Sequence, residues 1–118
     1  MLRNFYGTLA VTEWSPEDPA SHSRELSNGG IIHGQQNFAP EYRGDPTSCY
    51  GHETGVGKAL DSLKSRPDGV RVGIVGMGAG TAACYARSGD TYRFYDINPD
   101  VPRVAQKYFT YLPDLEKR

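Results

Sequence analysis

Three glycines and one aspartate have the types and the spacing of a nucleoside-binding site. Gly76, Gly78 and Gly80 directly follow an apolar run, and Asp96 comes 18 residues after Gly78, near the end of a second apolar run. Glycine lets the backbone bend sharply and lets a ligand approach without a Cβ in the way. A carboxylate at such a strand end can accept hydrogen bonds from both hydroxyls of a ribose. The alternative is an ordinary tight turn, with Asp96 acting as a capping residue.

The elements that must position these residues follow the order strand, turn, helix, strand. Residues 70–75 are rich in β-branched side chains and predict a strand buried on both faces, and residues 91–97 predict a second one. The Ala-rich segment 81–88 predicts a helix between them, which makes a βαβ unit with its ligand at the helix N-terminus. Asn98 is expected to cap the next helix, with Pro99 at its first position.

The spacing of the glycines favours one class of nucleotide. Dinucleotide-binding proteins use the pattern G-x-G-x-x-G, whereas here the pattern is G-x-G-x-G and Thr81 follows the last glycine. This difference favours a nucleoside without a pyrophosphate. S-adenosylmethionine and its relatives fit that description, and NAD is the lesser option.

The first part of the chain has the pattern of antiparallel β structure. Apolar and polar residues alternate over residues 5–12, and the turn sequence Asn28-Gly29-Gly30 separates two further extended segments, 22–28 and 31–36. Residues 37–49 have no apolar period and predict a loop.

The predicted fold class is therefore α/β. An N-terminal antiparallel β portion with its loop occupies residues 1–50, and a truncated Rossmann-like βαβ portion of the S-adenosylmethionine-dependent methyltransferase type occupies residues 51–118, opening with a helix over 53–64. One edge of the strand at 70–75 has no following neighbour in sequence. Because unpaired strand edges are templates for another chain, we expect a homo-oligomer in which a second copy covers that edge.

Composition narrows the range of partners. The 118 residues include 13 Lys and Arg against 14 Asp and Glu, and neither sign forms a long run, which argues against general nucleic-acid binding and favours a small-molecule partner. No apolar stretch approaches the roughly 20 residues that cross a bilayer, so we expect no membrane contact for this chain and a cytoplasmic location. Cys49 and Cys84 match no zinc-binding spacing, so no metal is expected.

At this point the chain resembles the spermidine synthases, or polyamine aminopropyltransferases, especially the branch often fused to membrane segments. The resemblance covers nearly the whole chain and is carried by short motifs. They are Arg3-Asn4-Phe5-Tyr6-Gly7, Leu26 through Asn28-Gly29, His33-Gly34-Gln35-Gln36, Tyr50-Gly51, Val72 to Gly80, Tyr95-Asp96-Ile97-Asn98-Pro99 and Ala105-Gln106-Lys107-Tyr108-Phe109.

The resemblance implies a small N-terminal β domain and a methyltransferase-like domain. The latter would bind decarboxylated S-adenosylmethionine and pass its aminopropyl group to putrescine. The residues implied in nucleoside binding are Gly76, Gly78, Gly80, Asp96 and Ile97. Gln36, or else Gln35, matches the substrate-side glutamine of the family, and Tyr50 matches the tyrosine near its amine site.

Two departures from the family keep other functions open. Ala79 stands where the family usually has an acidic residue, and the family's catalytic aspartates are expected after the region that the chain covers, so no catalytic residue is assigned and the chain itself is expected to be inactive. One alternative is a non-catalytic nucleoside-binding or interaction module. Another is a small-molecule methyltransferase using S-adenosylmethionine, which would share the glycines and Asp96 but would not need Gln36 or Tyr50. The choice of diamine and the presence of membrane spans in a full-length protein stay open.

Overall fold

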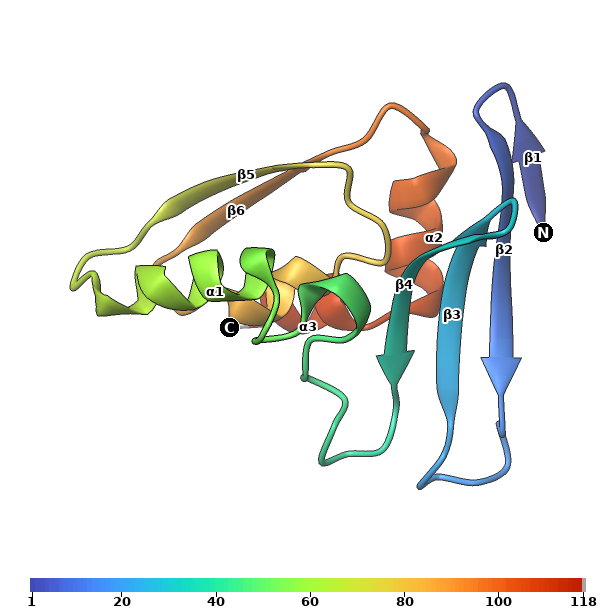
Figure 1. The fold of residues 1–118 in the computed structure, drawn as a ribbon, viewed down its shortest axis with the longest axis horizontal. Helices are drawn as coiled ribbons and strands as arrows, with labels where there is room; N and C mark the ends of the chain where they lie inside the picture. Colours follow the sequence, from blue (N-terminus) through green and yellow to red (C-terminus); the bar gives the residue numbers. More distant parts are fainter. Residues whose placement is uncertain (118) are drawn as a thin grey trace.

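The computed structural model describes residues 1–117, which form a mixed α/β structure with two separate sheets (Figure 1). The strands are β1 (Leu2–Asn4), β2 (Gly7–Trp14), β3 (Ser23–Asn28), β4 (Ile31–Asn37), β5 (Arg71–Val75) and β6 (Thr91–Tyr95). The helices are α1 (Gly55–Ser62), α2 (Asp100–Tyr108) and α3 (Tyr111–Glu116), with the short 3-10 helices η1 (Ser48–Tyr50), η2 (Leu63–Ser65) and η3 (Thr81–Tyr85).

The N-terminal sheet is antiparallel, with the strand order β1-β2-β3-β4. The alternation of the sequence sets its inner face, where Leu9 of β2 and Leu26 of β3 are buried. The antiparallel β portion is thus confirmed, but β2 begins at Gly7, two residues later than predicted. The reason is a tight turn that ends a short strand, β1, which the sequence did not reveal; Gly7 has φ +122° at this turn.

The second sheet is the parallel pair β5 and β6, in which Arg71 aligns with Thr91 and Val75 with Tyr95. The predicted helix over 81–88 between these strands is wrong, because only the 3-10 helix η3 forms. The chain leaves helical geometry at Ala86, which is extended with φ −71° and ψ 136°. The next backbone N–H, that of Arg87, donates to Asp90 Oδ2 instead of to a helical carbonyl.

The prediction that both parallel strands are buried on both faces is also wrong. The side chains of Val72, Ile74 and Phe94 pack towards a small core around Leu60, but Val75 on the other face is 89% exposed. Figure 1 shows α1 and the short helices on one side of the β5–β6 pair only. No element within residues 1–117 covers the other side, and the predicted homo-oligomer stays a prediction.

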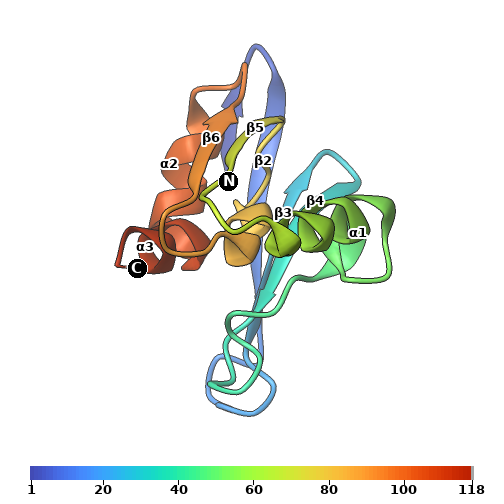
Figure 2. The same cartoon turned by 90° about the vertical axis from the view of Figure 1, so that its left-hand side faces the viewer.

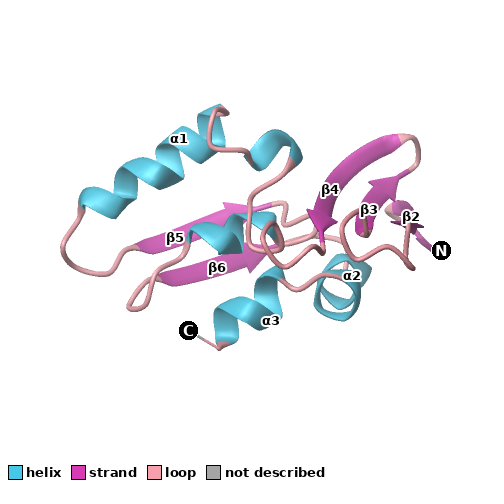
Figure 3. Cartoon of the chain, turned by 90° about the horizontal axis from the view of Figure 1, so that it is seen from below, coloured by secondary structure: helices cyan, strands magenta, loops and turns pink. Residues whose placement is uncertain are grey.

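The glycine-rich segment after β5 is held by the main core, which joins both sheets. This core includes Leu9 and Leu26 from the antiparallel sheet, Met77 and Ala79 from the glycine-rich segment, and Val101, Val104, Phe109 and Leu112 from the C-terminal part. Figure 1 shows α2 between the parallel pair and the antiparallel sheet, and Figures 2 and 3 show η3 between α1 and α3. The contact between the strands and this segment is close, because a Cβ added to Gly34 in β4 would lie 2.6 Å from the Cβ of Ala79.

Both longer helices start with the side chains that helix capping requires. Thr54 precedes α1, and its hydroxyl accepts a hydrogen bond from the Gly57 N–H at 3.1 Å. Before α2, Asn98 Oδ1 accepts from the Asp100 N–H at 3.0 Å, and Pro99 already has helical dihedral angles. The predicted cap is confirmed, although the assigned helix begins one residue after Pro99. Because α2 follows directly on β6, the cap brings its N-terminus to the carboxyl ends of the parallel strands.

Candidate functional site

A cavity of about 340 Å³ opens between the antiparallel sheet, the glycine-rich segment and the start of α2. Five residues that the sequence analysis singled out line it together: Tyr50, Gly76, Gly78, Asp96 and Ile97. They come from three separate segments of the chain. The carboxyl ends of parallel strands are where ligands bind in α/β sheets, because the adjoining turns leave a crevice there. The cavity occupies that position relative to β5 and β6.

Asp96 bridges the two loops that form this end of the parallel pair. Its Oδ2 accepts the Met77 N–H at 3.1 Å, and its Oδ1 accepts the Asn98 N–H at 3.0 Å. No ion pair among the described residues involves Asp96, so its charge is offset by backbone dipoles alone. Since each carboxylate oxygen can accept more than one hydrogen bond, Asp96 can still bind donors from a ligand.

The three glycines of the motif have different surroundings. All have positive φ values, which glycine adopts without strain. A Cβ at Gly76 would meet no atom within 4 Å, so a ligand can approach its backbone closely. A Cβ at Gly78 would overlap the carbonyl oxygen of His33 in β4. Gly80 is buried against Leu112 and lies outside the cavity lining, so its position does not match the predicted contact with a nucleoside.

Tyr50 contributes a hydroxyl group to the cavity from the end of η1. Burial raises the pKa of this phenol, and the neighbouring Cys49 and Asp96 raise it further. The hydroxyl therefore stays protonated at neutral pH and can donate a hydrogen bond. Its neighbour Tyr85 donates to the Tyr50 carbonyl oxygen, which holds the end of η1 against η3.

Gln36, predicted to face the substrate, lies outside the cavity. It is fully buried, and its Nε2 donates to the Arg43 carbonyl oxygen at 2.9 Å and to Thr110 Oγ1 at 2.6 Å. Its Oε1 accepts the Thr110 N–H at 2.8 Å. These bonds join β4 to the segment between α2 and α3. Gln35, the other glutamine considered, is also absent from the cavity lining.

Four polar or aromatic residues of the cavity were not predicted as site residues. They are Tyr6, Asn28, His33 and Asn98. The first three belong to the turns and strands of the antiparallel sheet, and only tertiary packing brings them to the carboxyl ends of β5 and β6. Asn98 was recognised as a cap, and the sequence carried no signal for its second role in the cavity wall.

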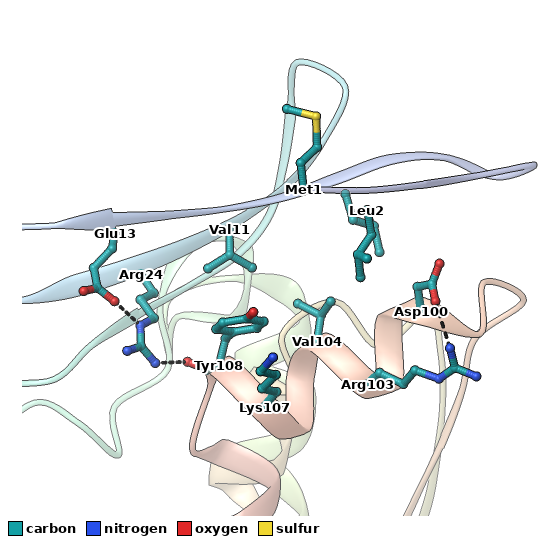
Figure 4. A pocket seen from close by; sticks show the side chains of 11 residues that line it. Met1, Leu2, Val11, Glu13, Arg24, Asp100, Arg103, Val104, Lys107 and Tyr108 are labelled. Carbon is teal, nitrogen blue, oxygen red and sulfur yellow. Dashed lines mark hydrogen bonds and ion pairs between the residues drawn. The ribbon is translucent and has the colours of Figure 1, made fainter.

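A second, larger cavity of about 560 Å³ lies between α2 and the antiparallel sheet (Figure 4). Its walls are apolar and its rim is charged, but the charges largely neutralise one another. Arg24 pairs with Glu13 and also donates to the Tyr108 carbonyl oxygen at 2.8 Å, while Arg103 pairs with Asp100 at 3.3 Å. Among the charged side chains of this cavity only Lys107 forms no ion pair within residues 1–117, so the cavity is the weaker candidate for a specific site.

The described residues show neither a metal-binding group nor a membrane-spanning helix. Among residues 1–117, no three His, Cys, Asp or Glu side chains are grouped so that they could hold a metal ion, and no helix is long and apolar enough to cross a membrane. Comparison with known proteins gave no match to a family model, to a curated protein or to a solved structure. The case for a function therefore depends on the cavity at the carboxyl ends of β5 and β6.

Proposed function

We propose that this cavity binds the adenosine part of S-adenosylmethionine or of its decarboxylated form. The observation that carries the proposal is Asp96, whose carboxylate borders the cavity beside the open backbone of Gly76 and has no cationic partner among the described residues. A ribose offers two adjacent O–H donors to such a carboxylate. Ile97, which is 76% exposed, offers apolar surface for the flat face of adenine.

The charge of the site suits a sulfonium ligand. Asp96 is negative, and no Lys or Arg lines the cavity. A sulfonium cation near an uncompensated carboxylate is favoured over a neutral or anionic analogue, and the attraction is strongest where water is excluded. The absence of a cation from the lining speaks against a nucleotide with a phosphate, which Arg or Lys side chains usually bind.

We extend the proposal to the Rossmann-like methyltransferase-type fold and to aminopropyl transfer in the full protein, on the basis of the resemblance to spermidine synthases. In that reaction the nitrogen of putrescine attacks the methylene carbon next to the sulfonium. The carbon–sulfur bond breaks, methylthioadenosine leaves, and a carboxylate takes the proton of the attacking amine. The protein mainly orients the two substrates and positions that carboxylate.

The position of Gln36 favours a second candidate, a nucleoside-binding module without amine transfer. The hydrogen bonds of Gln36 to Arg43 and Thr110 occupy its amide inside the fold and leave it away from the cavity. The two candidates differ in their response to putrescine. If the full protein transfers aminopropyl groups, putrescine must bind beside the nucleoside, whereas a binding module takes the nucleoside alone.

Calorimetry with methylthioadenosine tests the proposal. We expect saturable binding at one site per chain, and we expect Asp96→Ala to weaken it by about 1–3 kcal/mol because ribose hydroxyls lose their acceptor. Asp68→Ala, at an exposed loop position remote from the cavity, is the matched control and should bind like the natural chain. Equal affinities of all three proteins would remove Asp96 from the site, and no binding by the natural chain would refute the proposal.

A further inference from the structure

The larger cavity, between α2 and the antiparallel sheet, has an ion pair at each of its two ends (Figure 4). Glu13 and Arg24 form one pair, and Asp100 and Arg103 form the other. Asn4 Nδ2 also donates to Asp100 at 2.6 Å. Because these charged groups already bind protein partners, a ligand of this cavity must be held by the residues that lie between the two pairs.

The walls between the two ion pairs are mainly apolar. They are formed by side chains from the strands and from α2, namely Leu2, Leu9, Val11, Val104 and Tyr108. Figure 4 shows Leu2 and Val11 directed from the strands towards α2. An ordered water needs about two to four polar partners, which such walls do not supply. An aliphatic group that displaces poorly ordered water from them gains affinity.

Lys107 adds a positive charge to these apolar walls. It belongs to the cavity lining and forms no ion pair within residues 1–117, and its Nζ lies 5.1 Å from the centre of the Tyr108 ring. In Figure 4 it lies between the two ion pairs. The other two cations of the lining, Arg24 and Arg103, are each paired with a carboxylate, so Lys107 leaves one positive charge in excess. A ligand with a single negative charge would neutralise it.

A carboxylate suits this charge better than a phosphate does. Arg side chains recognise phosphates in the bidentate manner, but Arg24 already binds Glu13 and the Tyr108 carbonyl oxygen. Lys107 offers a point charge on a flexible aliphatic stem, which can adjust to one carboxylate at the mouth of the cavity. The ligand that matches both the walls and the charge is therefore an aliphatic chain with one carboxylate.

We propose that this cavity binds a free aliphatic carboxylic acid, whose alkyl chain lies between the strands and α2 and whose carboxylate accepts a hydrogen bond from Lys107 Nζ. The volume of about 560 Å³ is within the range of small-molecule sites. This site is additional to the proposed nucleoside site and does not depend on it, although Leu9 borders both cavities.

Calorimetry with decanoate, octanoate and decanol tests the proposal on the natural chain. Each buried methylene strengthens binding by about fourfold, so decanoate should bind at least about fivefold more tightly than octanoate, which is two methylenes shorter. Lys107→Gln should weaken the binding of decanoate by about threefold, because a partly exposed ion pair is lost. It should leave the affinity for decanol, which has no charge, unchanged.

A second variant tests the apolar wall. Leu2 is 43% exposed, so Leu2→Ser should not prevent folding, and it should weaken the binding of both decanoate and decanol by about threefold or more. Two matched controls lie outside the cavity lining. Lys58→Gln removes an exposed positive charge from α1, and Ile31→Ser removes an exposed apolar side chain from β4. Both should bind the two ligands like the natural chain.

A direct readout locates the ligand without any variant. In a ¹H–¹³C spectrum of the natural chain, decanoate should shift the methyl signals of Leu2, Val11 and Val104 and leave those of Val75 in place. If the natural chain shows no saturable binding of decanoate, or if Lys107→Gln and Leu2→Ser both bind it unchanged, the proposal is refuted. Shifts at Val75 alone would also refute it, because the ligand would then lie on the exposed face of β5.

Vesicles distinguish a free acid from a lipid surface as the source of the carboxylate or other anion. We expect the chain to remain in the supernatant when it is sedimented with vesicles of phosphatidylcholine and phosphatidylserine. Sedimentation with these vesicles that Lys107→Gln and Leu2→Ser abolish would assign the cavity to a membrane surface and overturn the proposal of a free acid. Binding of methylthioadenosine, measured separately, reports on the nucleoside site and is unaffected by either outcome.

Discussion

The two ends of the parallel β5–β6 pair each carry an aspartate that bridges backbone N–H groups, and the two differ in what else they bind. At the amino end, Asp90 Oδ1 accepts the Val70 N–H at 2.9 Å and Oδ2 accepts the Arg87 N–H at 2.8 Å. The Arg87 guanidinium lies 3.3 Å from the same carboxylate and donates to the carbonyl oxygens of Leu63, Lys64 and Arg66. The Asp90 side chain is only 2% exposed, so its carboxylate contacts only groups of the protein. We call this the closed end of the pair.

At the carboxyl end, which we call the open end, Asp96 also accepts hydrogen bonds from two backbone N–H groups. It pairs with no cation among the described residues. Asn98, two residues later, also lines the cavity, and its buried Nδ2 has no hydrogen-bond partner among the described residues. The same residue type therefore has two different surroundings. A closed network uses all its hydrogen-bonding capacity for stability, whereas an open one keeps capacity for a ligand.

The comparison predicts the largest loss of stability at the closed end. Asp90→Ala removes the acceptor of two backbone N–H groups and leaves the guanidinium of Arg87 without its carboxylate, so we expect Tm to fall by at least about 10 °C. Asp96→Ala should lower Tm less, because no cation loses its partner and one of the two backbone partners, Asn98, borders a cavity that water can enter. Differential scanning calorimetry measures both. Equal decreases in Tm for Asp90→Ala and Asp96→Ala would contradict the expected difference between the two ends.

Within the open end, two glycines should respond differently to the same change. Gly78→Ala adds a Cβ that overlaps the His33 carbonyl oxygen at a position with φ +53°, and we expect it to reduce the free energy of unfolding by about 3 kcal/mol. Gly76→Ala meets no atom, so only the strain of its positive φ remains, at about 1 kcal/mol.

Urea unfolding measures the stabilities of these two glycine variants, and methylthioadenosine binding supplies a second readout. Gly76→Ala should weaken binding although it costs less stability, because its methyl group occupies the space where the ligand approaches. If Gly76→Ala binds as well as the natural chain, the backbone of Gly76 is not part of the site.

The pH dependence of stability sharpens the description of the closed end. The Val70 and Arg87 backbone N–H groups, together with the Arg87 guanidinium, lower the pKa of Asp90 from its ordinary value of 3.8 to about 2. Because the folded pKa lies below the unfolded one, the stabilisation is complete above about pH 4 and is lost as the pH falls towards about 2.

Thermal unfolding of the natural chain and of Asp90→Asn between pH 7 and pH 2 tests this assignment. Asp90→Asn cannot titrate, so the difference in Tm between the two proteins should be constant near neutral pH and should shrink below about pH 4. A difference that stays constant down to about pH 2 would show that Asp90 does not have a lowered pKa.

The elements that carry the site were largely predictable because their signals are local in the chain. The apolar run before Gly76, the aspartate that follows the next run and the cap at Asn98 all depend on residues within a few positions of one another. The failures have local causes too. The segment 81–88 is rich in Ala, but the hydrogen bond of the Arg87 N–H to Asp90 ends the helical turn early. The exposed face of β5 was missed because a β-branched run does not reveal how many layers cover it.

The sequence by itself determined the antiparallel strands, the glycine-rich turn between two parallel strands and the place of Asp96 at the end of the second. Only the tertiary structure decided which polar groups have hydrogen-bond partners within the fold and which remain available to a ligand. Gln36 forms a hydrogen bond with Thr110, 74 residues away, and Asn98 accepts one from Asn4, 94 residues away. The physical reason is that hydrogen-bond satisfaction depends on partners brought together by packing, and no pattern among neighbouring residues specifies them.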